Sequence, residues 1–114
     1  MEPGVRVAAL LVTLLGLQAA AAQGVTAARQ VELVRMVRQD CGSCHGMLLT
    51  GGLGPALTRE ALADKPLSSV AATIFHGRPG TPMPGWRAML TEADAQWIAE
   101  QLTAGFPEER RSKR

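Results

Sequence analysis

The segment Cys41-Gly42-Ser43-Cys44-His45 holds two thiols three positions apart and an imidazole directly after the second thiol. Residues three apart lie on one side of a helical turn, so both thiols can reach one bound molecule and His45 can project from the same turn. This pattern is typical of covalent haem attachment. Each thiol adds to a haem vinyl group, and the imidazole binds the iron from one face. Cys41 and Cys44 are therefore predicted to anchor a haem and not to form a disulfide.

Two other kinds of site also contain paired cysteines. A thioredoxin-like redox pair requires a strand followed by a helix, and a structural zinc site requires two or three further Cys or His ligands. The chain has 2 cysteines and 2 histidines, the second histidine being His76. Neither setting is present, so the sequence favours one covalently attached haem c with its iron.

The first 22 residues have the pattern of an export signal. A short start with one basic residue precedes an apolar run, Val7 to Leu17, and an alanine-rich exit. Residues 1–22 are predicted to be a secretory signal peptide cleaved after Ala22, which places the mature protein in the periplasm. The apolar run is too short for a comfortable membrane span. An uncleaved anchor is the alternative, because alanine-rich cleavage regions sometimes stay intact.

The mature chain is predicted to form one domain, residues 23–107. Removal of the signal from the 114 residues leaves 92, enough for a compact domain but with few apolar residues for its core. A covalently held haem supplies the missing apolar body. Residues 108–114 contain no apolar residue and four basic ones, and they are predicted to be a disordered basic tail.

Without that basic cluster the mature chain is mildly acidic, with 7 basic and 9 acidic residues. No nucleic-acid partner and no permanent membrane span are expected, and the predicted form is a monomer. The tail can steer the protein to an acidic partner, or it can be a solvated segment that contacts nothing.

The pattern of apolar residues predicts helices and no strands. The predicted segments are Ala27–Asp40, a short helix over Arg59–Ala63 capped by Thr58, a helix from Pro66 to Gly77, and a last helix from Thr91 to Gly105 with Asp94 completing a capping box. The expected fold class is all-α, with three to five short helices wrapped around one haem.

The first helix is predicted to deliver the haem site. Leu33, Val37, Cys41 and Cys44 fall at steps of four, four and three, which places them on one stripe. The polar face of the same helix is interpreted as a solvated surface, and it carries Arg29, Glu32, Arg35 and Arg38.

Three other segments are expected to complete the domain. The glycine-rich loop Gly46–Leu57 is predicted to pass close to the haem, with Leu53 and Leu57 covering its edge. One face of the helix after Pro66 should meet the haem or the first helix, and one face of the last helix is apolar. The residues of these two faces are Leu67, Val70, Ala71 and Ile74, then Ala95, Ile98 and Leu102.

The second iron ligand is predicted to be Met83. Met36 and Met47 lie close in sequence to His45, so they are expected on the side of the haem that His45 already occupies. Met83 lies 38 residues beyond His45, between two prolines, and a stiff loop lowers the entropy cost of holding a weak thioether on iron. Met89 is the nearest methionine rival, but it lies in the approach to the last helix, where apolar packing explains it.

His76 and an open iron site are the remaining alternatives. His76 falls in the last turn of a predicted helix, where the helix dipole or packing beside the haem accounts for it. The choice decides the function, because a His/Met pair raises the reduction potential and leaves no position for a substrate. A His/Met pair therefore predicts electron transfer and no catalysis at the iron, whereas an open site would permit a small haem enzyme.

Residues 27–106 resemble a small bacterial monohaem cytochrome c of the His/Met kind. The resemblance rests on the order of three motifs before a C-terminal helix: Cys41–Gly46, Gly54–Leu57 and Gly80–Pro84. It implies the cytochrome c fold and a hydrogen bond from the ligand histidine to the backbone carbonyl of Pro55, which fixes the orientation of the ring.

More narrowly, the motifs are similar to those of the cytochrome c-55X group, small periplasmic cytochromes that accompany dihaem nitrite reductase in denitrifying bacteria. This resemblance implies a carrier that passes one electron between larger redox proteins, plausibly as a donor to nitrite reductase. The alternative that it implies is a role in handling or maturing the second, non-covalent haem of that enzyme.

The chain departs from the usual cytochrome c pattern where the terminal helices cross. Gln30 and Val34 stand where the family has a glycine and an aromatic residue, and Gln101 stands in place of an aromatic residue. The usual close crossing is therefore not expected. Trp97, one turn earlier, is placed to fill the gap.

Overall fold

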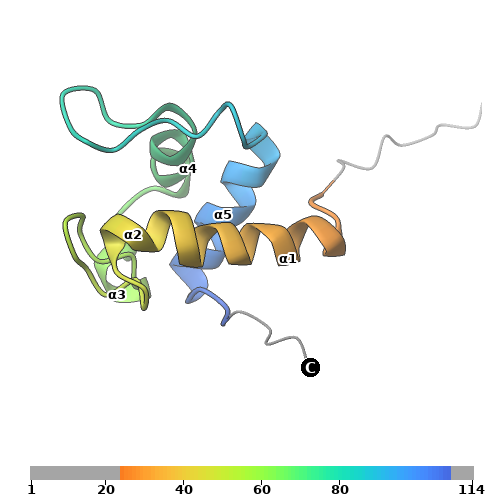
Figure 1. Cartoon of the computed structure of the whole chain (residues 1–114), viewed down its shortest axis with the longest axis horizontal. Coiled ribbons are helices and arrows are strands. Elements are labelled where there is room, and N and C mark those ends of the chain that lie inside the picture. The colour runs from red at the N-terminus through yellow and green to blue at the C-terminus, as the bar shows by residue number, and fades with distance from the viewer. Residues whose placement is uncertain (1–23, 109–114) are drawn as a thin grey trace, which may run out of the picture.

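This computed structural model describes residues 24–108. The predicted signal peptide and the tail beyond Glu108 lie outside the described residues. Within the described part of the chain the regular structure is helical and contains no strand (Figure 1), which confirms the all-α class. No helix in this part is long and apolar enough to cross a membrane.

The first helical run extends further than predicted. It consists of α1 (Ala27–Met36), a π-helical segment η1 (Val37–Cys41) and α2 (Gly42–His45), which follow one another without a break. Thr26 caps the start, where its hydroxyl accepts a hydrogen bond from the backbone N–H of Arg29 at 3.2 Å. The predicted end at Asp40 was too early, and the haem-attachment motif itself is helical.

The π-helical segment divides the predicted stripe into two parts. The backbone N–H of Gly42 bonds to the carbonyl of Val37, five residues back, and this wider turn rotates all later side chains. Leu33 and Val37 are fully buried, whereas Cys41 is half-buried and Cys44 is exposed. Leu33 and Val37 therefore lie in the protein core, Cys41 packs against its edge, and Cys44 points to the surface.

Two short helices follow the glycine-rich loop, and both begin as predicted. α3 (Arg59–Leu62) is capped by Thr58, whose hydroxyl accepts from the backbone N–H of Ala61 at 3.2 Å. α4 (Leu67–His76) starts after Pro66 and ends at Gly77, whose φ of 75° suits a residue without a side chain.

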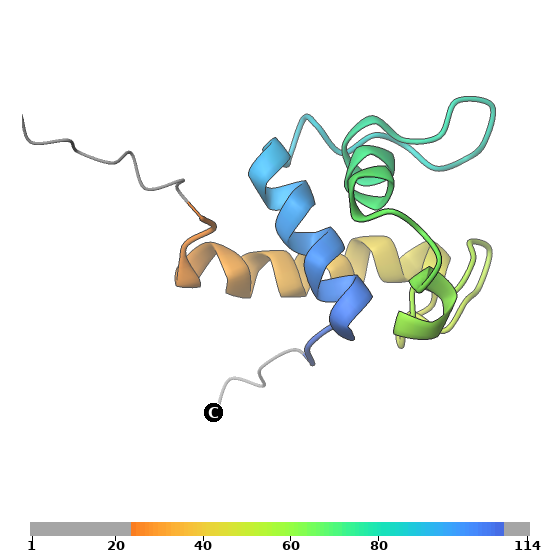
Figure 2. The ribbon, with the colours of Figure 1, turned by 180° about the vertical axis from the view of Figure 1, so that it is seen from behind.

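The last helix, α5 (Glu92–Ala104), has the predicted capping box. The Thr91 hydroxyl accepts from the Asp94 N–H at 3.0 Å, and the Asp94 carboxylate accepts from the Thr91 N–H at 3.1 Å. Gly105 ends the helix with a φ of 97°. Figures 1 and 2 show α5 crossing α1.

The core lies mainly where α5 meets α1 and α4. The apolar face of α4 packs mainly against α5 and not against the first helix, and its expected contact with the haem stays a prediction. The predicted face of α5 is buried against both neighbours. The buried apolar residues are Leu33, Val37, Leu49, Leu62, Val70, Ile74, Leu90, Ala95, Ile98, Ala99 and Leu102.

The crossing of the terminal helices α1 and α5 is open on one side. The departures from the family pattern at Gln30, Val34 and Gln101 predicted this. A surface hollow of about 320 Å³ is lined by Gln30 and Val34 of α1 and by Trp97 and Gln101 of α5, among others. Trp97 is half-buried and packs against the core. It forms one wall of the hollow and leaves the hollow open, so the expectation that it fills the gap was wrong.

Candidate haem site

His45 ends α2 and is held by the loop that follows it. Its ring Nδ1 lies 2.7 Å from the carbonyl oxygen of Pro55, so the hydrogen bond expected from the resemblance is present. A carbonyl oxygen can only accept, so Nδ1 carries the proton and the lone pair of Nε2 is free. Only 9% of the residue is exposed. His45 is thus a buried, oriented imidazole with one nitrogen available to a metal.

The glycines of the loop pack against His45 and its helical turn. A side chain at Gly54 would lie 2.8 Å from Nδ1 and Cε1 of the imidazole, and one at Gly52 would lie 2.8 Å from the Cys44 carbonyl oxygen. These glycines are thus needed for close contacts within the protein, and the expected approach of the loop to the haem stays a prediction. Leu57 is half-buried against the core, whereas Leu53 is 95% exposed.

The two thiols are free, and their setting differs from that of a redox pair. Burial raises the pKa of the Cys41 thiol to about 11, and the negative charge of Asp40 adds to the effect. Reactive cysteines have lowered pKa values, so Cys41 lacks the electrostatics of a thioredoxin-like site. Among residues 24–108 no group of three or more His, Cys, Asp or Glu side chains could hold a metal ion.

Met83 lies on the loop between α4 and α5, which is non-helical as predicted. Its backbone is held from both sides: Arg78 donates its N–H to the Met83 carbonyl at 3.2 Å, and the Met83 N–H donates to the Thr81 hydroxyl at 3.3 Å. The Thr81 hydroxyl donates in turn to the Arg78 carbonyl at 2.7 Å. The Met83 side chain therefore projects from a defined turn.

Two glycines at the base of this loop let it fold back onto the end of α4. A side chain at Gly85 would lie 2.7 Å from the His76 carbonyl carbon, and one at Gly77 would lie 2.6 Å from the Gly85 nitrogen. One residue further on, Trp86 donates its N–H to the carbonyl of Ile74 in α4 at 3.1 Å. The loop is thus attached to α4 through backbone contacts that side chains at Gly77 and Gly85 would block.

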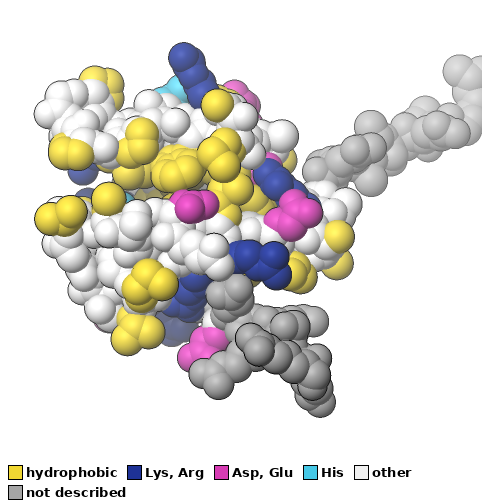
Figure 3. Space-filling view, viewed as in Figure 1, with side chains coloured by type: hydrophobic (Ala, Val, Ile, Leu, Met, Phe, Trp, Pro, Cys, Tyr) yellow, Lys and Arg dark blue, Asp and Glu magenta, His cyan; other side chains and the backbone are white. Residues whose placement is uncertain are grey.

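The two loops extend from the same end of the molecule. Figures 1 and 2 show the glycine-rich loop beside α2 and the Met83 loop beside α4, on opposite layers. In Figure 3 the surface between the layers is hollowed, and hydrophobic side chains cover its floor. The structure therefore places the His45 segment on one side of an apolar hollow and the Met83 segment on the other.

The two rival ligands, His76 and Met89, both lie at the surface. His76 is exposed, and its ring meets Phe75 edge-on at a centroid distance of 4.9 Å. The Met89 side chain is 53% exposed, so the interpretation that apolar packing explains this residue was wrong. Its backbone carbonyl instead accepts a hydrogen bond from Arg29 at 3.0 Å.

Two arginines of the first helical run, Arg29 in α1 and Arg38 in η1, were misread as part of a solvated face. Arg29 binds Asp94 of α5, and Arg38 donates to the carbonyl oxygens of Phe106 and Pro107 at 3.2 and 2.9 Å. For Arg29 the sequence held one signal: a basic residue in the first turn of a helix opposes the helix dipole. For Arg38 it held no comparable signal.

Comparison with known proteins decides the family. Residues 28–101 match the family model described as cytochrome C oxidase, cbb3-type, subunit III. The chain is 54% identical over 104 residues to cytochrome c55X of Stutzerimonas stutzeri, which covers 91% of this chain and 88% of the relative. The chain belongs to the cytochrome c55X family. As a c-type cytochrome it carries a covalently bound haem c.

The cytochrome c fold is shared with a solved relative. The structure of the c-type cytochrome NirC superposes with a TM-score of 0.69 at 54% identity, over 69% of this chain and 93% of that one. The cytochrome is also 36% identical over 74 residues to dihydro-heme d1 dehydrogenase of Pseudomonas aeruginosa, of which it covers 15%. The last likeness therefore concerns one part of a much longer protein.

Proposed function

We propose that this c-type cytochrome is a periplasmic one-electron carrier in which Cys41 and Cys44 hold the haem, His45 binds the iron on one face and Met83 binds it on the other. The observation that carries the proposal is the 2.7 Å contact between His45 Nδ1 and the Pro55 carbonyl oxygen. It fixes the tautomer and the orientation of the imidazole, and it increases the basicity of the free Nε2.

The cysteines form the covalent attachment. Each S–H bond would add across one haem vinyl group, with a C–S bond formed, the proton moved to the other vinyl carbon, and no oxidant required. Both thiols are unpaired, and Cys44 is accessible at the surface. The exposed position of Cys44 fits a side chain that must meet a large planar molecule beside α2.

Met83 supplies a neutral thioether to the opposite face. Bound haem supplies the one-electron couple between ferric and ferrous iron. With His45 and Met83 both bound, no coordination position is left for a substrate, and a thioether favours the ferrous state. One electron is taken from a reduced donor and passed to an oxidised acceptor, and no bond is formed or broken in the carrier.

The surface around the hollow suits brief docking to a redox partner. Residues 46–58 and 79–86 include no charged side chain. Leu48 and Leu53 on the first of these loops are 77% and 95% exposed. An uncharged, partly apolar surface next to the haem allows close approach without burying charges. Following the resemblance to the cytochrome c-55X group, we propose nitrite reductase as the acceptor and the periplasm as the location.

The substitution Met83→Ala tests the ligand assignment. The variant should keep its covalent haem, lose the long-wavelength methionine–iron band, bind carbon monoxide readily in the ferrous state, and show a lower reduction potential. Met89→Ala and His76→Ala are the matched controls, and both should behave as the wild type does. If a control variant, and not Met83→Ala, opens the iron, the assignment of Met83 is wrong.

A role in handling a second tetrapyrrole is the other candidate function. The similarity to dihydro-heme d1 dehydrogenase over 65% of this chain favours it. The carrier proposal predicts no stoichiometric binding when the holoprotein is titrated with a free tetrapyrrole. Saturable binding of one equivalent would support the handling role instead.

A further inference from the structure

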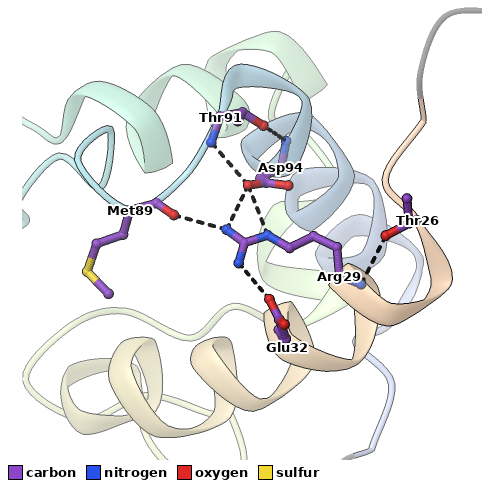
Figure 4. A network of polar contacts seen from close by, with 6 residues as sticks. All are labelled: Thr26, Arg29, Glu32, Met89, Thr91 and Asp94. Carbon is purple, nitrogen blue, oxygen red and sulfur yellow. Dashed lines mark hydrogen bonds and ion pairs between the residues drawn. The ribbon is translucent and has the colours of Figure 1, made fainter.

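A polar network joins the first turns of α1 and α5 to the segment that follows Met83 (Figure 4). The Arg29 guanidinium donates from Nη2 and Nε to the same Asp94 oxygen, at 2.9 and 3.3 Å. Nη2 also donates to the Met89 carbonyl oxygen at 3.0 Å, and Nη1 reaches Glu32 at 2.9 Å. One side chain therefore holds α1, α5 and the connection between Met83 and α5.

The stability of α1 alone does not explain Arg29 at this position. A positive charge in the first turn opposes the helix dipole, and Thr26 already caps the helix. The partner side chain of Asp94 is only 6% exposed, and a buried carboxylate requires a charged or hydrogen-bonding partner. The residue types thus indicate a tertiary contact between two elements that lie far apart in the sequence.

The two proposed iron ligands belong to different parts of the molecule. His45 ends the run formed by α1, η1 and α2, whereas Met83 lies on the loop that α4 and α5 hold. A thioether is a weak ligand for iron, so it stays bound only while the distance between these two parts is fixed. Any contact that ties the Met83 loop to the first run can therefore affect the coordination of the iron.

Arg29 makes such a contact, and Arg38 provides a natural comparison. Both arginines extend from the first run, and both donate to backbone carbonyls near α5. Arg38 contacts Phe106 and Pro107, with its guanidinium 5.4 Å from the Phe106 ring centre, so it fastens the segment after α5. Arg29 fastens the segment before α5, which leads directly back to Met83.

We propose that Arg29 is a positioning residue for Met83. It holds the segment from Met83 to Leu90 against the helical run that carries His45, and this contact keeps the thioether on the iron. The inference rests on the proposed function, in which Met83 is the ligand. A residue that only stabilised the fold would change unfolding alone. A positioning residue also changes how often Met83 leaves the iron in the folded protein.

The substitution Arg29→Lys tests this inference in the ferric holoprotein. Lysine keeps a positive charge for Asp94, but it lacks the planar fork that reaches Asp94 and the Met89 carbonyl together. Cyanide can bind only when Met83 is off the iron, so its association rate reports the open fraction. Loss of one hydrogen bond from a charged donor should raise that rate roughly ten-fold. The matched control Arg38→Lys should leave the rate unchanged, although its unfolding midpoint falls.

A double variant keeps the test valid if a lone buried carboxylate prevents folding. Arg29→Met combined with Asp94→Asn removes the guanidinium without leaving Asp94 charged and unpaired. It should bind cyanide at the same increased rate as Arg29→Lys, with an unchanged helical circular dichroism spectrum.

Two results would overturn the inference. Equal cyanide rates in the Arg29→Lys, Arg38→Lys and wild-type proteins would show that Arg29 does not position the ligand. If the cyanide association rates of Arg29→Lys and Arg38→Lys both rise in proportion to the stability that each variant loses, Arg29 has a structural role only. The Met83→Ala variant separates these results from a failure of the proposed function. If that variant keeps the wild-type spectrum and cyanide rate, then the ligand assignment fails and the inference fails with it.

Discussion

The two sides of the hollow hold the proposed iron ligands, His45 and Met83, by different means. On the His45 side, the ligand is one residue from Cys44, in the same helical turn, and the Pro55 carbonyl fixes its ring. On the Met83 side, the ligand projects from a loop held by backbone hydrogen bonds and by glycine contacts with α4. In the proposed site, a thioether at the neighbouring Cys44 would tie His45 to the haem, whereas Met83 would have only the fold to hold it.

This difference suits an electron carrier. On the His45 side, the proposed thioether bonds would have to break before the haem could leave. On the Met83 side, the loop is held only by non-covalent contacts worth a few kcal/mol each. Disturbing the first side should therefore remove the cofactor. Disturbing the second should leave the haem in place and open the iron.

The largest effect is expected from the double substitution Cys41→Ala and Cys44→Ala. Both thioether bonds are then impossible, and the protein loses its covalent haem together with a large part of its core. Haem staining of denaturing gels should give no signal for this variant. Ser43→Ala, between the two cysteines, is the control and should stain as the wild type does. A stained band from the double variant would contradict the assignment of the anchors.

A pair of glycine substitutions compares the two sides directly. Gly54→Ala places a methyl group 2.8 Å from the His45 ring, and Gly85→Ala places one 2.7 Å from the His76 carbonyl carbon. Each should destabilise the protein by about 2 kcal/mol through overpacking. Only Gly85→Ala should also open the iron to carbon monoxide, because it lifts the Met83 loop from α4.

Gly24→Ala, where no atom lies within 4 Å of the added methyl group, is the control for both substitutions. Thermal unfolding followed at a helix wavelength and carbon monoxide binding to the ferrous protein measure the two effects. The comparison fails if Gly54→Ala opens the iron as readily as Gly85→Ala does.

The sequence predicted the elements well where one residue type determines the local structure. The Thr58 cap, the capping box at Thr91 and the glycine ends of α4 and α5 all lie where the sequence placed them. The contact between His45 and Pro55 was expected from the resemblance alone. These features depend on neighbours in sequence or on a motif with fixed spacing.

The sequence could not predict features that depend on tertiary contacts. No residue signals the π-helical segment Val37–Cys41. Leu49 has a φ of 60°, a conformation that favours glycine, and its side chain is buried in the core. Arg29 appeared to lie on a solvated face because its partner, Asp94, is 65 residues away.

A smaller effect is expected from pH through Asp94. Burial opposes ionisation of this carboxyl, but hydrogen bonds from Arg29 and from the Thr91 backbone outweigh it and hold the pKa of Asp94 below its ordinary value of 3.8. A lowered folded-state pKa contributes stability above the ordinary value, and this stability is lost as the pH falls through the folded-state pKa. Acid should therefore weaken the Arg29–Asp94 contact, which holds the segment after Met83.

Asp94→Asn should remove this acid dependence and lower the free energy of unfolding at neutral pH by about 1–2 kcal/mol. The measurement is chemical unfolding of the wild type and the variant between neutral and acid pH. If the free energies of unfolding of the wild type and the variant differ by the same amount at every pH, the Arg29–Asp94 pair does not link protonation to stability.

The central claim, that His45 and Met83 are the two iron ligands, is tested most directly by proton NMR of the ferrous protein with labelled methionine methyl groups. A methionine bound to haem iron places its methyl group over the ring, where the ring current shifts its resonance far upfield. We predict one such resonance, which disappears in Met83→Leu and persists in Met89→Leu. Methionine resonances that all lie at their ordinary positions, or a shifted one that survives in Met83→Leu, would contradict the account.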